Sequence, residues 1–390
     1  MTILSNPSSH PTLHPPTSED GLVTWVRLLR SRRVGISTFY RLVKEHGSAE
    51  GAIDALPQIA KASGVENYEP HSQQAAQHEL TQARKLGIKA IPYGNPSYPA
   101  LLARIPDPPP ILWVKGDLTP LTRPIVAVVG ARNASAIGTR FTKRLVQELG
   151  ESGILISSGL ARGIDTAAHA AALPSGSIAV MAGGVDYIYP AQNTKLAQDM
   201  LATGLRLSEQ PIGLVPQARH FPTRNRIISG LAHATIVIEA TAKSGSLITA
   251  HAALDQGRDV FAVPGHPFDE RAAGCNNLIR DGAQLLRNTQ DIINMLEHSQ
   301  LTAPAAPPPE VQEQLAFRET PQRSLRDASR LHQVILSRLN TTPMREDVLI
   351  ADLQEPTSHV SAAVSELEIM GKLNRVMGGM LQKRPKEMHD

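Results

Sequence analysis

The chain has 390 residues, of which 41% are hydrophobic, 19% are charged and only 4% are aromatic, and its formal net charge is +3 at pH 7. This length exceeds one ordinary domain and this composition can fill a sizeable core, which excludes a wholly disordered chain. The small positive charge permits a polyanionic partner without requiring one, so the placement of the basic residues matters more than their number.

The cysteine content and the hydropathy pattern indicate a cellular compartment. Cys275 is the single cysteine, so no intramolecular disulfide can form, which suits a reducing environment. No apolar stretch approaches the roughly 20 residues that span a bilayer. Residues 1–18 also lack the basic start and apolar run of a secretory signal. We therefore expect a cytoplasmic protein that does not insert into a membrane.

The composition changes several times along the chain and predicts its domain organisation. Residues 1–18 are rich in Pro, Ser, Thr and His, as disordered termini are. Residues 19–90 show helical periodicity and predict a small helical domain. A Pro-rich bridge without helix opens the next predicted domain, residues 91–300. Residues 301–327, which include TAPAAPPPE, predict a linker, and residues 328–390 resume with helices.

From Pro124 onward, short β-branched runs alternate with helical stretches. This alternation is typical of βαβ units and predicts an α/β fold with a doubly wound, mostly parallel sheet. The predicted strands are residues 125–129, 154–157, 177–181, 205–208, 235–239 and 260–263.

Nearly every predicted strand is followed by a loop rich in glycine or polar residues. In chain order these loops read GARNAS, SGLARGID, AGGVDYIYP, SEQP, ATAKSGS and PGHP. The carboxyl ends of parallel strands share one edge of the sheet, and ligands of such sheets bind beyond that edge. Six such loops therefore predict a continuous functional rim.

The loop sequences disfavour the common nucleotide cofactors. The first loop, GARNASAIG, lacks the G-x-G-x-x-G of dinucleotide sites, and KSGS lacks the spacing of a Walker A loop. What remains is a set of main-chain N–H groups at helix starts with arginines among them, a combination that suits phosphate oxygens. The arginines are Arg132, Arg162, Arg219, Arg224 and Arg226. Several such positions along one rim suit a chain of phosphates.

The stretch FPTRNRIISGL places two of these arginines on a short apolar helix. We expect Thr223 to cap this helix, with Arg224 and Asn225 in the first turn, where the helix dipole favours an anion. Arginine at a helix start runs against the dipole, and an anionic ligand would explain it. Pairing of Arg226 with a carboxylate such as Glu239 is the alternative, and the sequence leaves both open.

Long blocks in a fixed order carry a resemblance to a known family. They are GARNASAIG, SSGLARGIDTAAHAAAL, IAVMAGGVDYIYPAQN, LSEQP, FPTRNRIISGL, IVIEATAKSGSLITAHAALDQGRDVFAVPG and GCNNLIRDGA, between residues 130 and 283. Together they resemble the DNA-processing protein A family (DprA, also called Smf). The resemblance implies an extended Rossmann-like domain that binds and protects single-stranded DNA, loads the RecA recombinase onto it during natural transformation, and forms homodimers. It implies a non-enzymatic protein without cofactor or metal.

The resemblance also implies a set of DNA-binding residues. They are Gly130, Arg132, Ser135, Gly159, Gly163, Asp165, Arg219, Phe221, Arg224, Asn225, Arg226, Ser244, Gly245, Ser246 and Thr249. Family members often carry a lysine shortly before the FP pair, whereas this chain has QARH, so Arg219 is expected to replace it.

The flanking segments agree with the family in outline. The first domain looks like a sterile-alpha-motif or helix-hairpin-helix relative. The last domain looks like a winged helix, with helices at about 328–340, 344–353 and 357–371 and a hairpin through LNRVMGGMLQKR. The would-be recognition helix carries Glu366 and Glu368, whereas a groove reader is normally basic. We therefore expect it to contact protein rather than to read DNA bases.

A second hypothesis is an enzyme that acts on free nucleotides. The rim resembles, more distantly, the lonely-guy phosphoribohydrolases, which remove bases from nucleoside monophosphates with the glutamate of a PGG-x-GT-x-x-E signature. The corresponding region here, ATAKSGSLITA, contains no glutamate. Assays of DNA binding and of base release separate the two hypotheses.

Overall fold

The computed structural model describes residues 15–302, 325–339, 343–353, 355, 357–376 and 380–383. The expected disordered terminus and the expected linker lie outside these ranges, apart from a few residues at their edges. None of the described helices combines the length and the apolar character needed to cross a bilayer.

The chain divides into two compact units, which we describe separately. The first consists of the residues up to Leu29 together with Ser72–Glu297, and the second of Arg30–His71 together with the chain from His298 onward.

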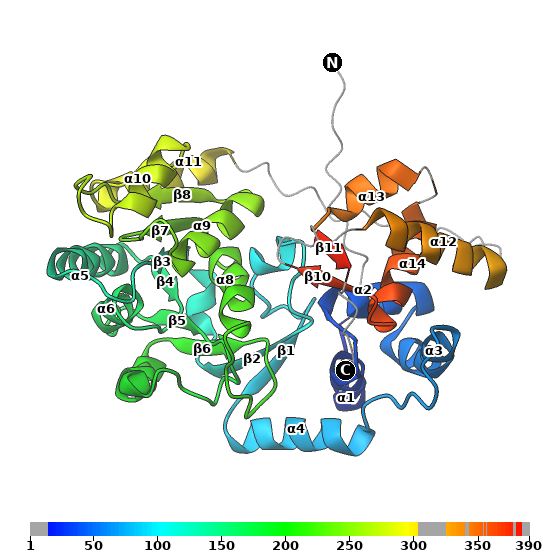
Figure 1. The fold of residues 1–390 in the computed structure, drawn as a ribbon. Coiled ribbons are helices and arrows are strands. Elements are labelled where there is room, and N and C mark those ends of the chain that lie inside the picture. The colour runs from blue at the N-terminus through cyan, green and yellow to red at the C-terminus, as the bar shows by residue number, and fades with distance from the viewer. Residues whose placement is uncertain are drawn as a thin grey trace, which may run out of the picture. The chain divides into compact units, whose positions relative to one another are not determined.

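A nine-stranded sheet forms the centre of the first unit, with the strand order β1-β2-β6-β5-β4-β3-β7-β8-β9. Figure 1 labels the strands from β1 to β8. The strands are β1 (Lys89–Pro92), β2 (Ile111–Gly116), β3 (Ile125–Val129), β4 (Leu155–Ser158), β5 (Ser177–Val180), β6 (Leu205–Ser208), β7 (Ala234–Val237), β8 (Asp259–Ala262) and β9 (Gln284–Leu285). Pairing is parallel from β6 through to β9, whereas β1 and β2 add antiparallel pairs at one edge. All six predicted strands are therefore confirmed within two residues at each end, and β1, β2 and β9 were missed.

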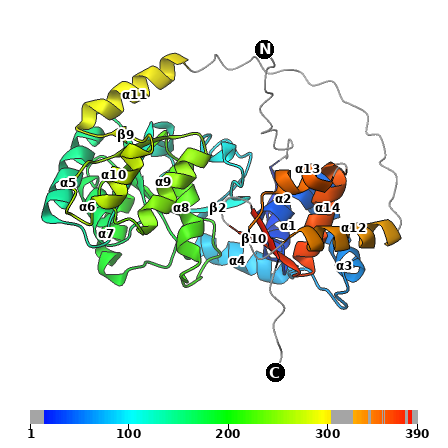
Figure 2. The same ribbon diagram turned by 45° about the horizontal axis from the view of Figure 1, so that its top comes forward.

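Helices cover both faces of this sheet. They are α5 (Ala136–Glu151), α6 (Ile164–Ala171), α7 (Thr194–Asp199), α8 (His220–Gly230), α9 (Gly245–Asp255), α10 (Ala273–Arg280) and α11 (Thr289–Thr302). One core is shared by α8, α9 and α10, and a second core by α5, α6 and α11. Helices α8 and α9 lie side by side (Figures 1 and 2).

Strand β3 shows why the sequence folds this way. Its five residues are all buried; Ile125, Ala127 and Val129 face the core of α8 and α9, and Val126 and Val128 face the core of α5 and α6. A parallel strand buried on both faces reads as a continuous apolar run. The chain proceeds from β3 to β4 on one side and has β7 on the other side, so the sheet is doubly wound with its switch point at β3 and β7.

Two further helices belong mainly to the first unit. They are α1 (Glu19–Arg30) and α4 (Gln73–Lys85). Their surfaces are joined by Glu19, whose carboxylate pairs with Arg84 at 2.6 Å and accepts a hydrogen bond from Gln77.

The second unit contains α2 (Ile36–His46), α3 (Ala49–Ala62) and a winged-helix arrangement. The latter comprises α12 (Leu325–Arg338), α13 (Glu346–Leu353), α14 (Thr357–Ile369) and the antiparallel hairpin of β10 (Leu373–Val376) and β11 (Met380–Lys383). Arg375 of the hairpin pairs with Glu346 and Glu368, and Glu366 lies 2.7 Å from His332. The acidic residues of α14 therefore take part in internal pairs.

Candidate nucleic-acid interface

Three loops meet at the carboxyl edge of the sheet, where β3, β4 and β7 end. The N–H of Ile164 donates to the carbonyl of Ala131, which joins the loop after β4 to the loop after β3. The N–H of Ser135 donates to Glu239, which joins the loop after β3 to the loop after β7. Three of the six loops of the predicted rim are therefore joined to one another.

Glycines allow the first two loops to cross closely. Gly163 has φ +79°, and a Cβ there would lie 2.2 Å from the carbonyl oxygen of Ala131. A Cβ at Gly130 would lie 2.6 Å from Ile164. No other residue type fits these contacts without displacing backbone or core. The two glycines thus fix the backbone that carries Arg132.

Arg132 forms a surface cluster with two aromatic rings. Its guanidinium carbon lies 5.4 Å from the ring centre of Phe221, a cation–π geometry. The Tyr189 ring meets Phe221 edge-on, with centroids 5.6 Å apart, and Tyr189 is 49% exposed. Arg132 is exposed and, among the described residues, makes no ion pair. Sequence reasoning missed Tyr189, which lies 32 residues before Phe221 and meets it only through the fold.

Arg224 lies in the interior rather than on the rim surface. It is 5% exposed, and its Nη1 donates to the carbonyl oxygens of Gly159, at 2.7 Å, and of Val180. A Cβ at Gly159 would lie 2.4 Å from Arg224 Nη1, so glycine is needed there. Burial lowers the pKa of Arg224 to about 10, and nearby Asp165 opposes this shift, so the side chain stays charged at neutral pH. This geometry gives Arg224 a positioning role for the loop after β4.

The buried carboxylate of Asp165 binds the main chain of the same loop. Its carboxylate accepts hydrogen bonds from the N–H groups of Gly159 and Ala161, each at 3.2 Å. Burial raises its pKa, while the charge of Arg224 and these hydrogen bonds act in the opposite direction. Because the carboxylate points into the protein, Asp165 holds the loop in shape.

Arg226 is also internal and has two carboxylate partners. It pairs with Glu209 and, at 3.0 Å, with Asp107, and its side chain is 12% exposed. Of the two explanations that the sequence left open, the structure supports carboxylate pairing, with Glu209 and Asp107 in place of Glu239. The pair connects α8 to the loops after β6 and before β2.

Helix α8 begins earlier than the sequence suggested. Its first residue is His220 and its N-cap is Arg219, so the expectation that Thr223 caps the helix is wrong. The Thr223 hydroxyl instead donates to the carbonyl of Arg219 at 3.0 Å. Arg224 therefore falls beyond the first turn and points into the core. Arg219 is exposed at the helix start, and its Nε donates to Nε2 of His220 at 3.3 Å.

The start of α9 adds a second polar edge beside α8. Ser244 is the N-cap and accepts a hydrogen bond from the N–H of Ser246, and Asn225 donates to the carbonyl of Gly245 at 3.3 Å. Ser246 and Thr249 are buried, whereas Ser244 is partly exposed and Gly245 is exposed. Of these four predicted residues, Ser244 and Gly245 are thus open to a ligand.

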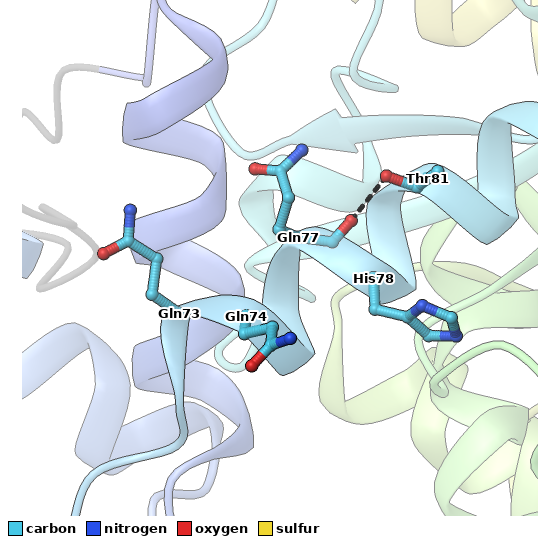
Figure 3. A pocket seen from close by; sticks show the side chains of 5 residues that line it. All are labelled: Gln73, Gln74, Gln77, His78 and Thr81. Carbon is cyan, nitrogen blue, oxygen red and sulfur yellow. Dashed lines mark hydrogen bonds between the residues drawn. The ribbon is translucent and has the colours of Figure 1, made fainter.

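Arg162 is exposed in the loop after β4. Within the described ranges, no three His, Cys, Asp or Glu side chains gather in a way that could hold a metal ion. A cavity of about 570 Å³ lies along α4 (Figure 3). Polar side chains of that one helix line it: Gln73, Gln74, Gln77, His78 and Thr81. Helix α4 packs beside edge strand β1, several strands away from β3 and β7.

Family models match the chain in three consecutive segments. The model for DNA recombination-mediator protein A matches residues 89–297. A DprA-like N-terminal HHH domain matches residues 19–82, and a DprA winged helix domain matches residues 319–379.

Curated relatives and solved structures agree with these matches. The chain is 46% identical over 220 residues to DNA processing protein DprA of Bacillus subtilis, covering 56% of this chain and 74% of that protein. It is 37% identical over 297 residues to Protein Smf of Escherichia coli, covering 75% and 77%.

Two solved structures superpose on the fold. The X-ray structure of DprA from Streptococcus pneumoniae has a TM-score of 0.52 at 34% identity, over 67% of this chain and 98% of that one. DprA from Helicobacter pylori, whose structure concerns its single-stranded DNA binding mode, has a TM-score of 0.50 at 32% identity, over 54% and 96%. Since the first family model covers more than half of the chain, the chain belongs to the DNA recombination-mediator protein A family, also known as DprA or Smf.

Proposed function

We propose that the chain binds single-stranded DNA along the rim and acts as a non-enzymatic recombination mediator. The observation that carries the proposal is the surface cluster of Arg132, Phe221 and Tyr189, held on a glycine-shaped crossing of two loops. A guanidinium that makes no ion pair among the described residues suits a phosphate. The exposed ring of Tyr189 and the half-buried ring of Phe221 beside it suit an unstacked base.

The cluster supports a binding mode in which phosphate contacts dominate. Aromatic residues are only 4% of the chain, so there are few rings on which bases could stack. Arg132 and Arg219 are exposed, and Ser244 and Gly245 at the start of α9 are at least partly exposed. We infer weak sequence preference and a strong dependence of affinity on salt concentration. The single-stranded DNA binding of the Helicobacter pylori relative supports the same ligand class.

The test is the affinity for a labelled oligothymidine, measured by fluorescence anisotropy at fixed salt. Arg132→Glu should weaken binding at least tenfold, because it replaces the guanidinium that binds a phosphate by a carboxylate that repels it. The matched control is Arg144→Glu on α5, an arginine that is 81% exposed. Equal affinities of the Arg132→Glu variant and the parent would place the DNA elsewhere. Base release from nucleoside monophosphates would instead support the phosphoribohydrolase hypothesis.

We further propose that the chain protects incoming DNA, loads RecA onto it during natural transformation and works as a homodimer through the first unit. Membership of the family supports these proposals. RecA filament formation on strands coated by a single-strand binding protein should increase on adding this protein. An unchanged rate would reduce the role to that of a coating protein. Sedimentation equilibrium without DNA tests the dimer.

A further inference from the structure

The switch point of this sheet differs from an ordinary nucleotide site in one respect. In doubly wound folds, a nucleotide phosphate sits at the N-terminus of the helix that follows the first central strand, in the crevice where the strand order reverses. Here that helix is α5 after β3, and the strand order reverses between β3 and β7. The position is already occupied by a side chain of the protein.

Glu239 reaches this position from the loop after β7. Its carboxylate accepts from the N–H of Ser135 at 2.9 Å and from the hydroxyl of Ser135 at 2.5 Å. Ser135 is the N-cap of α5, and its hydroxyl in turn accepts from the N–H of Gly138 at 2.9 Å. Among the described residues, Glu239 makes no ion pair. The donors at this helix start and the nearby positive charge of Arg271 stabilise its carboxylate.

Gly138 leaves the space that the carboxylate fills. A Cβ at this residue would lie 2.5 Å from Glu239 Cδ and Oε1. Any other residue type would therefore force the carboxylate to move away from its present position. Gly138, Ser135 and Glu239 thus form one fitted arrangement that joins the two sides of the switch point.

We propose that Glu239 is a specificity-determining residue, which occupies the phosphate position of the switch point and so excludes free nucleotides. A monoester phosphate carries nearly two negative charges at pH 7, and it would have to displace a carboxylate from the donors of α5. The diester phosphates of DNA carry one charge each and meet the exposed Arg132 outside the crevice. This last statement rests on the proposed function, whereas the exclusion of nucleotides does not.

The exclusion is tested with AMP and inorganic phosphate as probes, by isothermal titration calorimetry at constant ionic strength. The parent protein should show no binding at millimolar probe. Glu239→Ala, which vacates the helix start, should bind AMP at least tenfold more tightly than the parent. Glu239→Gln keeps an amide oxygen on Ser135 and should give a smaller gain. The matched control is Glu151→Ala at the exposed far end of α5, which should behave like the parent.

Three results would overturn the inference. The first is that the parent binds AMP as tightly as Glu239→Ala does. The second is that Glu239→Ala has the circular dichroism of the parent but gains no affinity for AMP. The third is that Glu151→Ala gains as much affinity for AMP as Glu239→Ala. Should both Glu239 variants fail to fold, competition on the parent decides. AMP should then displace no more oligothymidine than sodium sulfate of equal ionic strength, and stronger displacement by AMP would refute the exclusion. If the parent does not bind oligothymidine while Glu239→Ala still gains affinity for AMP, only the proposed function is refuted.

Discussion

Arg224→Ala tests whether this arginine holds the rim together from inside. The substitution removes the donor to the carbonyl oxygens of Gly159 and Val180 and the positive charge that faces the buried carboxylate of Asp165. An unsatisfied buried group costs about 1–3 kcal/mol, and a buried charge that loses its partner costs about 3–5 kcal/mol. These effects overlap, so we expect the free energy of unfolding to fall by about 3–5 kcal/mol.

The assay is thermal unfolding followed by circular dichroism. For a unit of this size, the expected loss lowers the melting temperature by roughly 6–20 °C. Arg132→Ala is the matched control, because Arg132 is exposed and its loss should change stability by less than about 0.5 kcal/mol. A melting temperature of Arg224→Ala within about 2 °C of the parent would refute the positioning role.

Three further outcomes are expected. Tyr189→Ala and Phe221→Ala should each weaken oligothymidine binding by about 1–3 kcal/mol, whereas Tyr187→Ala in the same loop should not; equal effects of all three would contradict base stacking. Stability should fall as the pH drops below 6.5, because burial lowers the pKa of His169 to about 3, so only the unfolded state takes up the proton. Between pH 6.5 and 4.5, the free energy of unfolding of His169→Gln should fall by about 2–3 kcal/mol less than that of the parent. Urea unfolding measures it, and an identical dependence on pH in both proteins would contradict this. Glu368→Gln should destabilise the winged helix, because Glu368 pairs with Arg375. Hydrogen exchange of the amides between residues 325 and 383 measures this loss, and unchanged protection would refute the pairing.

The sheet could be predicted from the sequence because parallel strands buried on both faces leave a plain signal. The run IVAVV of β3 is one such strand, and Gly-rich loops mark the ends of the others. Strands β1 and β2 were missed because they flank a Pro-rich segment and pair antiparallel at the sheet edge, where no βαβ alternation marks them.

The sequence could place the arginines of the candidate site in the loops and the helix at the sheet edge. It could not predict whether each side chain faces the solvent or the interior. An arginine that begins a short helix is usually exposed, and only the fold brings the carbonyl oxygens of Gly159 and Val180 within hydrogen-bond distance of Arg224. Pro222 does indicate that the helix begins before Thr223, because proline is tolerated in the first turn of a helix. The partners of Arg226 and the contact of Tyr189 with Phe221 join residues far apart in sequence.

Photocrosslinking of a 5-iodouracil oligothymidine, mapped by mass spectrometry, tests the central claim most directly, because iodouracil reacts with aromatic side chains that it touches. We predict crosslinks to Tyr189 or Phe221, which disappear in the Arg132→Glu variant. Crosslinks confined to the second unit, with none between residues 130 and 250, would contradict binding at the rim.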